Sequence, residues 1–421
     1  MSSMDDSDAT AATAATAATA MSSDQRRDLR LLAALRGGSF LGDNIALVAL
    51  YLRLAPQGHP WEIAALSIAS ALPLVVLAPV AGHVVDRVRA KPLLVALSVL
   101  EALVCVGIGY WHSLDATLGL AALLSVGVSF SMPGYSTLMV AIAGEDNVGR
   151  AQGLMQGVQG AATVAGPILG GLLVGWTGQS WPLYIDAASF ALGALGTAAI
   201  TRDRRPDGDA AREHPQMTAG MRHIFADRLL RPIVIMVFVF MASVVMVNVA
   251  EVFFATRTLH ASATLYGAIG ASFGLGTILG SIGAQKLDQS PVRLARAVLV
   301  AIGITALAIG AVGLVTRIEW VYPLMIVAGS AVGVANVAAV TLFTVRTPEE
   351  IRGRMFAAVN AVFISGELSS TVLGGLLLTL VAPRTVFQIA GVVSTIAIAV
   401  LGPFALANAR SAHRREGLQG A

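Results

Sequence analysis

Residues 149–173 read GRAQGLMQGVQGAATVAGPILGGLL, and residues 353–377 read GRMFAAVNAVFISGELSSTVLGGLL. The two stretches align without a gap at a separation of 204 residues, so that Gly149-Arg150 falls on Gly353-Arg354 and the LGGLL of 169–173 recurs at 373–377. Each copy is an apolar run that follows a charged turn. A repeat of this length and character indicates two homologous membrane halves.

Composition supports a membrane protein. Of 421 residues, 56% are hydrophobic and 13% are charged, with a mean hydropathy of +0.74. A soluble fold of this size does not carry such a composition on its surface. A bilayer core about 30 Å thick requires about 20 helical residues, and the runs lack the alternating pattern of a membrane barrel. We therefore expect an all-α polytopic protein with twelve transmembrane helices in two pseudo-symmetric six-helix bundles, at 31–54, 62–85, 92–111, 114–142, 151–176, 181–200, 232–255, 263–285, 294–316, 320–345, 355–380 and 385–408.

Charge predicts the orientation. An even number of spans places both termini on one side, and all but four of the 28 Lys and Arg residues lie on that side or at its edge. The positive-inside rule therefore predicts cytoplasmic termini. The net charge of +3 reflects this loop asymmetry and does not indicate a nucleic-acid surface. The four exceptions are Arg53, Arg257, Arg317 and Arg384.

The remaining segments divide the chain into domains. Residues 1–28 contain ATAATAATAATA and are expected to form a disordered tail, in which Met21 is an alternative start. Residues 29–201 form the first six-helix domain. The segment 202–228 is a cytoplasmic linker with a short amphipathic interfacial helix, predicted over 221–230. Residues 229–409 form the second domain, and 410–421 form a cytoplasmic tail.

The turn after the second span reads GHVVDRVRAK at residues 82–91. It resembles the loop signature of the major facilitator superfamily through Gly82, Asp86, Arg87 and Lys91, although Arg89 and Ala90 depart from that signature. A positive-inside loop would explain the cations but not the carboxylate. The resemblance implies that these residues form a conformational latch against the other half.

A second signature lies in the fifth span. Gly166-Pro167 followed by Gly170-Gly171 resembles the glycine-proline signature of the superfamily's exporters. Glycines allow helices to approach closely, and a proline permits bending. In the second copy Gly374-Gly375 persist while Gly-Pro is replaced by Ser370-Thr371, so close packing is shared by both halves and the Gly-Pro element occurs once.

Further stretches narrow the resemblance to the bacterial exporter branch that includes macrolide and enterobactin efflux proteins. They are SFLGDNIALVAL (39–50), Met132-Pro133, DRLLRP (227–232) and TPEEIRGRMFA (347–357). The resemblance implies a monomer in the bacterial cytoplasmic membrane, with a small molecule and protons as partners. The arginine-bearing motif of drug–proton antiporters is absent from the fourth span.

Ionisable residues within spans are costly and mark functional sites. Five carboxyl groups qualify, and the repeat duplicates none of them: Asp43, Glu101, Asp186, Glu251 and Glu367. Asn44 and Asn248, in contrast, are paired across the repeat. In the superfamily the first, fourth, seventh and tenth helices line the central cavity. This implies Asp43, Asn44, Asn248 and Glu251 as proton or substrate residues, with Glu367 as a further candidate; structural hydrogen-bonded carboxyls are the alternative.

Other chemistries find no support in the sequence. The seven histidines lie at span ends or in loops, the single Cys105 suits packing, and neither a metal site nor a cofactor site is expected. Gly274-Leu275-Gly276 suits helix packing better than dinucleotide binding. Without a Walker A sequence the chain cannot itself use ATP, and the scattered carboxyls do not form the catalytic set of a membrane-embedded enzyme.

The sequence thus predicts a secondary active exporter that uses proton antiport and alternating access. Every Arg and Lys is expected in a loop or near a span end, so a neutral or cationic amphiphile is the expected substrate. A solute importer of the same fold remains an alternative. So does a lysophospholipid-type flippase, because LGDN at residues 41–44 also resembles that branch.

Overall fold

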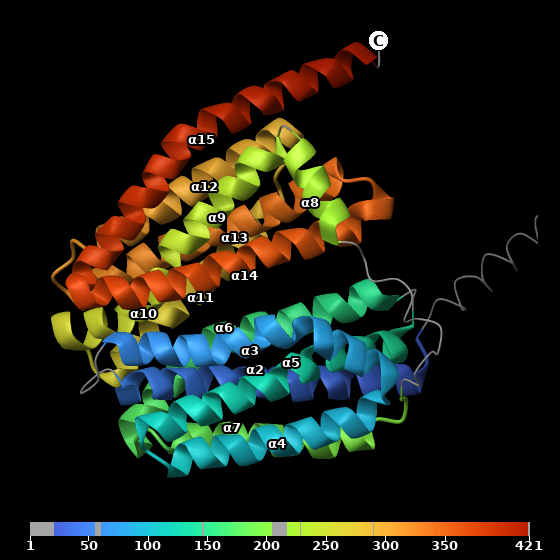
Figure 1. Ribbon diagram of the computed structural model, residues 1–421, viewed down its shortest axis with the longest axis vertical. Helices are drawn as coiled ribbons and strands as arrows, with labels where there is room; N and C mark the ends of the chain where they lie inside the picture. The colour runs from blue at the N-terminus through green and yellow to red at the C-terminus, as the bar shows by residue number, and fades with distance from the viewer. Residues whose placement is uncertain are drawn as a thin grey trace, which may run out of the picture.

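The computed structural model describes residues 21–54, 60–144, 147–203, 217–227, 229–288 and 290–419 (Figure 1). These residues form helices and no strand. The N-terminal bundle comprises α2 (Ser23–Leu54), α3 (Pro60–Arg87), α4 (Ala90–Tyr110), α5 (Leu114–Ala143), α6 (Val148–Thr177) and α7 (Trp181–Ala199). The linker carries α8 (Met217–Ala226). The C-terminal bundle comprises α9 (Leu230–Val244), α10 (Met246–Phe253), η3 (Phe254–Thr258), α11 (Ala263–Ala284), α12 (Pro291–Val312), η4 (Ile318–Trp320), α13 (Val321–Arg346), α14 (Glu349–Leu380) and α15 (Pro383–Gln419).

The predicted membrane fold is confirmed. Within the described residues, ten helical segments are long and apolar enough to cross a bilayer, with α9, α10 and η3 together making one of them. The helices α7 and α14 run beside these spans in the two bundles (Figure 1). Asp186 and Ser189 lower the mean hydropathy of α7.

Short connections keep consecutive helices together. Ser113 and Ser262 cap α5 and α11, because each hydroxyl accepts a hydrogen bond from a backbone N–H of the first turn. Gly144 and Gly178 end α5 and α6 at φ values of 74° and 82°, which glycine adopts without strain.

The two bundles share a core at one end only. We call the end where α2 begins and α15 ends the terminus side, and the other end the opposite side; the terminus side lies to the right in Figure 1. On the opposite side one hydrophobic cluster runs through both bundles, and includes Leu66 of α3 and Phe253 of α10. On the terminus side the two bundles have separate clusters, one around Leu138 and one around Phe240. The bundles are thus joined on the opposite side.

In both halves, the two glycines of the repeated pair pack against different helices. The first glycine packs inside its own bundle: a Cβ on Gly170 would lie 3.0 Å from Val48 Cβ of α2, and one on Gly374 would lie 3.0 Å from Met246 Cβ of α10. The second glycine packs across the interface, where Gly171 meets the α11 backbone and Gly375 meets Ala64 of α3. The repeat therefore encodes both bundle assembly and bundle contact.

The glycines of α11 serve two neighbouring helices. Gly267, Gly270 and Gly274 face Pro167 and Val164 of α6, across the interface. Gly276 and Gly280 instead face the backbone of α13 near Ser330, within the C-terminal bundle. The packing role expected for this run is therefore what the structure shows.

The terminus side of the interface is open. Among the described residues, no atom of another helix lies within 4 Å of a Cβ built on any terminus-side glycine of α6 or on Gly82 of α3. The α6 glycines concerned are Gly149, Gly153, Gly157 and Gly160. Together with the shared core on the opposite side, this makes the conformation closed at one end and open at the end that carries the termini.

Several helix boundaries differ from those expected. Helix α2 begins at Ser23, inside the predicted tail, and α15 continues through most of 410–421. The linker helix begins at Met217 and ends at Ala226, because Asp227 leaves the helix and its carboxylate accepts hydrogen bonds from the first amides of the next helix, α9. Helix α8 packs on α14 and buries Ile224 there, so its apolar face contacts protein. The tail before residue 21, linker residues 204–216, Glu145 and Arg228 lie outside the described residues.

The glycine pairs yield a prediction about stability and conformation. We expect Gly170→Leu and Gly374→Leu to lower the melting temperature of the purified protein by several degrees, since overpacking a bundle costs about 1–3 kcal/mol. Gly171→Ala should leave the melting temperature unchanged. The added methyl group would clash with α11 of the other bundle, and the two bundles can move apart to relieve the clash without unfolding. Disulfide crosslinking of cysteines placed on the opposite-side ends of α6 and α11 should then fall several-fold. Equal thermal destabilisation by Gly170→Leu and Gly171→Ala would contradict this division.

Candidate functional site

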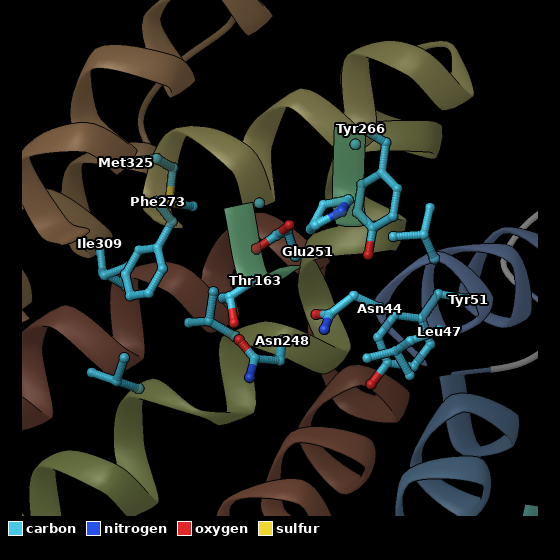
Figure 2. Close-up of a pocket in the computed structure, with 16 residues that line it drawn as sticks. Asn44, Leu47, Tyr51, Thr163, Asn248, Glu251, Tyr266, Phe273, Ile309 and Met325 are labelled. Atoms are coloured by element: carbon cyan, nitrogen blue, oxygen red, sulfur yellow. The ribbon is translucent and has the colours of Figure 1, made fainter. Parts of the chain in front are cut away.

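A cavity of about 300 Å³ lies between the bundles (Figure 2). Its N-terminal wall comes from α2 and α6 and its C-terminal wall from α9 to α13. The lining is mostly apolar, with a few polar groups, which is usual for small-molecule sites. The polar side chains on it are Asn44, Tyr51, Thr163, Asn248, Glu251 and Tyr266.

A second cavity of about 250 Å³ adjoins the first. Leu47, Tyr51 and Asn248 line both of them, so the two cavities lie on either side of shared wall residues. The second cavity adds Ser67 and Ser70 of α3 and, from α14, Glu367. We call the two together the central cavity.

The charge of the central cavity has one sign. Glu251 and Glu367 are the charged side chains among the described residues that line it, and no lysine, arginine or histidine is among those residues. An ionised carboxylate in an apolar site is costly unless a cation or hydrogen-bond donors compensate it. The central cavity can therefore pair a carboxylate with a proton or with a cationic ligand.

Asn44 and Asn248, which the repeat places in equivalent positions, both line the cavity (Figure 2). The Asn44 amide donates a 2.7 Å hydrogen bond to the Phe40 carbonyl of its own helix. Gly166 lies directly against Asn44, and any larger residue there would collide with its Cβ. The glycine of the Gly-Pro element thus makes room for a cavity residue, while Pro167 faces α11.

Asp43 lies elsewhere. It is not among the residues that line the central cavity, although its neighbour Asn44 is. Adjacent residues of a helix point about 100° apart. Asp43 interacts electrostatically with Glu101 and Asp186, so these three carboxyls belong to a polar cluster inside the N-terminal bundle. We call it the bundle cluster.

The bundle cluster is buried and hydrogen-bonded. Glu101 and Asp186 are each 1% exposed. The Ser131 hydroxyl donates to Glu101 at 3.0 Å, and the Cys105 thiol donates to Asp186 at 3.4 Å. Glu101 and Asp186 therefore share the surroundings of Asp43. Within the described part of the chain no group of three or more His, Cys, Asp and Glu side chains is placed to hold a metal ion.

Arg36 corrects the expectation that every cation lies in a loop or near a span end. Because α2 begins at Ser23, Arg36 lies well inside the helix, and its guanidinium stacks 4.4 Å from the ring centres of Phe40 and Tyr135. The Tyr135 hydroxyl in turn lies 3.1 Å from the Ser98 hydroxyl. Arg36 faces the bundle cluster, where it interacts with Asp43, so it does not neutralise the central cavity.

The residues of the loop signature at 82–91 have different surroundings. Arg87 is exposed and Gly82 faces open space. Lys91 instead holds its own bundle together: its backbone N–H donates to Asp203 at 3.1 Å, and its ammonium group donates to the Ile200 carbonyl at the end of α7. The structure therefore separates Lys91 from the part of the loop that faces the open interface.

The aromatic cavity residues are the ones that the sequence did not single out. Tyr51 lies seven residues after Asn44 and so shares its helix face, which was the available signal. Tyr266 and Phe273 occupy the facing wall on α11 (Figure 2).

Two pseudo-symmetric helical bundles around a central cavity, joined at one end and open at the other, define a secondary transporter. The sequence profile of the Major Facilitator Superfamily matches residues 32–254 and 233–420. The chain belongs to this superfamily of transporters.

Two relatives extend the comparison. The chain is 27% identical to the "Uncharacterized MFS-type transporter YfiS" of Bacillus subtilis (strain 168) over 180 residues, 42% of this chain and 43% of that protein. It is 27% identical to the "Enterobactin exporter EntS" of Escherichia coli O127:H6 over 275 residues, 64% of this chain and 61% of that one. The chain thus spans less than two thirds of either relative.

Solved structures share the fold. The nucleoside transporter NupG superimposes with a TM-score of 0.71 at 15% identity, over 90% of this chain and 98% of that one. A bacterial homologue of the human lysosomal transporter Spinster, in an inward-facing and unoccupied conformation, gives 0.68 at 14% identity, over 93% and 98%.

The separation of the two polar regions is testable by thiol accessibility. In a Cys105→Ser background, cysteines at Leu47 and Thr163 should react with a small water-soluble thiol reagent at least about tenfold faster than a cysteine at Ser131. Leu47 and Thr163 are exposed toward the cavity, whereas Ser131 is 3% exposed in the bundle cluster. Equal rates at Leu47 and Ser131 would show that the cluster opens into the cavity.

Proposed function

We propose that the protein exports a neutral or cationic amphiphilic small molecule across the cytoplasmic membrane by proton antiport with alternating access. The observation that carries this proposal is the central cavity, whose charged side chains are two carboxyls in an apolar wall. An apolar ligand body fits such a wall, and a cationic group can pair with a carboxylate.

The direction of transport rests on orientation and relationship. The positive-inside rule assigns the terminus side, and with it the open end of the cavity, to the cytoplasm. A substrate would then enter from the cytoplasm in the conformation described. One relative is named as an exporter.

Proton exchange supplies the coupling. A carboxylate that holds a cationic substrate releases it when the group takes up a proton, because the neutral acid no longer attracts the cation. Glu251, in the wall of the larger cavity, is our first candidate for this exchange, and Glu367, in the wall of the adjoining cavity, is the second. Asp43 remains a candidate for proton binding in the bundle cluster, apart from the substrate.

Transport in inverted membrane vesicles tests this function. With an acidic interior, vesicles that carry the protein should accumulate a cationic dye, and a proton ionophore should abolish the accumulation. Glu251→Gln should reduce the initial rate at least about tenfold, which corresponds to about 1.4 kcal/mol. Glu319→Gln, which removes an exposed carboxyl outside the central cavity, is the matched control. Unchanged dye transport by Glu251→Gln, or export of a polyanion instead, would refute the proposal.

We also propose that Asp86 and Arg87 form the latch that closes the terminus side. In the conformation described, Arg87 is exposed and the neighbouring Gly82 faces open space, as an open latch requires. Asp86→Asn and Arg87→Ala should therefore reduce transport several-fold at an unchanged melting temperature, because they bias a conformational equilibrium rather than the core. Wild-type rates in both variants would exclude the latch.

A further inference from the structure

The membrane span formed by α9, α10 and η3 is interrupted beside the central cavity. Helix α9 ends at Val244, α10 begins at Met246, and the π-helical η3 follows α10 directly. The equivalent span of the first half, α2, is one continuous helix. Asn248 and Glu251 therefore lie on a short segment, α10, that has irregular backbone at both ends.

This span packs against α14 in a different register from the one that the repeat predicts. In the first half, the backbone of Ile45 of α2 lies 3.1 Å from a Cβ built on Gly170 of α6. Gly374 is the equivalent of Gly170 in the repeat. The three atoms nearest to a Cβ built on Gly374 all belong to Met246, and the closest lies at 2.9 Å. Met246 lies three residues before Val249, which is the equivalent of Ile45.

A second contact gives the same displacement. Gly37 of α2 packs on Val158 of α6, where a Cβ built on the glycine would lie 3.1 Å from the valine Cβ. Met241 is the equivalent of Gly37, but it contacts Gly366, four residues after Val362, the equivalent of Val158. All four helices run from the terminus side to the opposite side (Figure 1). Both contacts therefore place α9 and α10 about one helical turn, or roughly 5 Å, nearer the opposite side than α2 is in the first bundle.

Ser370 of α14 explains the displacement. It is the equivalent of Gly166, which lies directly against Asn44 and leaves no room for a Cβ. Ser370 carries a Cβ, so Asn248, the equivalent of Asn44, cannot take the corresponding place beside it. The span is displaced along α14 instead.

The surroundings of Ser370 agree with a steric role. Gly366 and Gly374 lie one turn on either side of it on the same face of α14, and they contact Met241 and Met246. Ser370 therefore faces the interruption between α9 and α10. Its side chain is 0% exposed, and its hydroxyl has no hydrogen-bond partner among the described residues. A hydrogen bond is thus not what places a serine here.

The displacement spreads the polar groups of the central cavity along its length. Asn44 lies beside Gly166, whereas Asn248 lies two residues beyond Met246 on the displaced span. Glu251 follows about one turn later. The buried residues of α10 on either side of Glu251 belong to the core that joins the two bundles on the opposite side. The carboxyl is therefore held toward the closed end of the cavity.

We propose that Ser370 is a positioning residue for the transport site. Its Cβ holds the displaced span in place and keeps Glu251 at the closed end of the central cavity. The inference rests on the proposed transport of a cation. An elongated amphiphile, whose cationic group reaches the closed end while its apolar body fills the wall, then binds better than a compact cation does.

Disulfide crosslinking tests the register. In a Cys105→Ser background, Met246→Cys with Gly374→Cys reports the displaced register, and Val249→Cys with Gly374→Cys reports the undisplaced one. A disulfide forms when the two Cβ atoms lie about 3.5–4.5 Å apart. Ser370→Gly should raise the ratio of the second crosslink to the first at least about threefold, because α10 can then approach the register of α2.

Two variants control for the other effects of this substitution. Ser370→Ala keeps the Cβ and loses only a hydroxyl without a partner, so the crosslinking ratio should stay at the wild-type value. Ser369→Gly adds the same backbone freedom one residue away, where the hydroxyl donates to the Ser365 carbonyl of its own helix. It should also leave the ratio unchanged.

Transport measurements test the consequence for selectivity. Apparent KM values are measured in vesicles for an elongated and for a compact monocationic dye. Ser370→Gly should raise the ratio of the first KM to the second at least about fivefold, because the carboxyl leaves the closed end. A loss of folded protein would lower both maximal rates and leave this ratio unchanged. Ser370→Ala should keep the wild-type ratio.

The outcomes separate the two claims. Equal crosslinking ratios in wild type and Ser370→Gly, or a shift of the same size in Ser370→Ala or Ser369→Gly, would overturn the role of the Ser370 Cβ and leave cation transport standing. A shifted register with an unchanged KM ratio would overturn the link to selectivity. If Ser370→Gly yields no folded protein, a changed KM ratio in Ser370→Ala contradicts the proposal. Wild-type vesicles that accumulate neither dye under a proton gradient would overturn the proposed function itself, while the crosslinks still decide the register.

Discussion

The structure depends on the backbone contact between α6 and α11. Gly171 and Pro167 of α6 lie against Gly267 of α11 with no side chain between them. Any larger residue at the two glycines would meet backbone atoms, which cannot move aside as a flexible side chain can. This contact joins the two bundles on one side while the terminus-side glycines of α6 stay apart, so it can act as a pivot. Alternating access needs such a contact, because bundles that rock must touch at some point in every state.

The packing roles of the repeated glycines are the same in both halves, whereas the charges differ. Each half uses its first repeated glycine inside the bundle and its second across the interface. Among the described residues, in contrast, the carboxyls that line the cavity belong to the C-terminal bundle, and the bundle cluster with Arg36 belongs to the N-terminal one. Both halves can therefore move as equivalent bodies while they contribute different chemistry to the space between them.

The repeat and the apolar runs were sufficient to predict the fold, because span length and glycine packing are local properties of the sequence. Helix faces were harder to predict. Asp43 and Asn44 are adjacent, and only the packing of α2 against its neighbours decides which of them reaches the cavity. The sequence placed Arg36 near a span end because the apolar run begins at residue 31, whereas helix α2 already begins at Ser23. Tyr51 follows Asn44 on the same face of α2, but the walls that it faces come from helices distant in sequence.

The central claim is that the bundles rock about the α6–α11 contact around one cavity, and paired distance measurements test it directly. Spin labels at Trp176 and Leu265 report the opposite side, and labels at Gln152 and Ile282 report the terminus side; all four side chains are exposed. A change from acidic to alkaline pH with a cationic substrate present should lengthen the first distance and shorten the second, in the same fraction of molecules. A change at one pair without the other, or no change at either, would contradict the account.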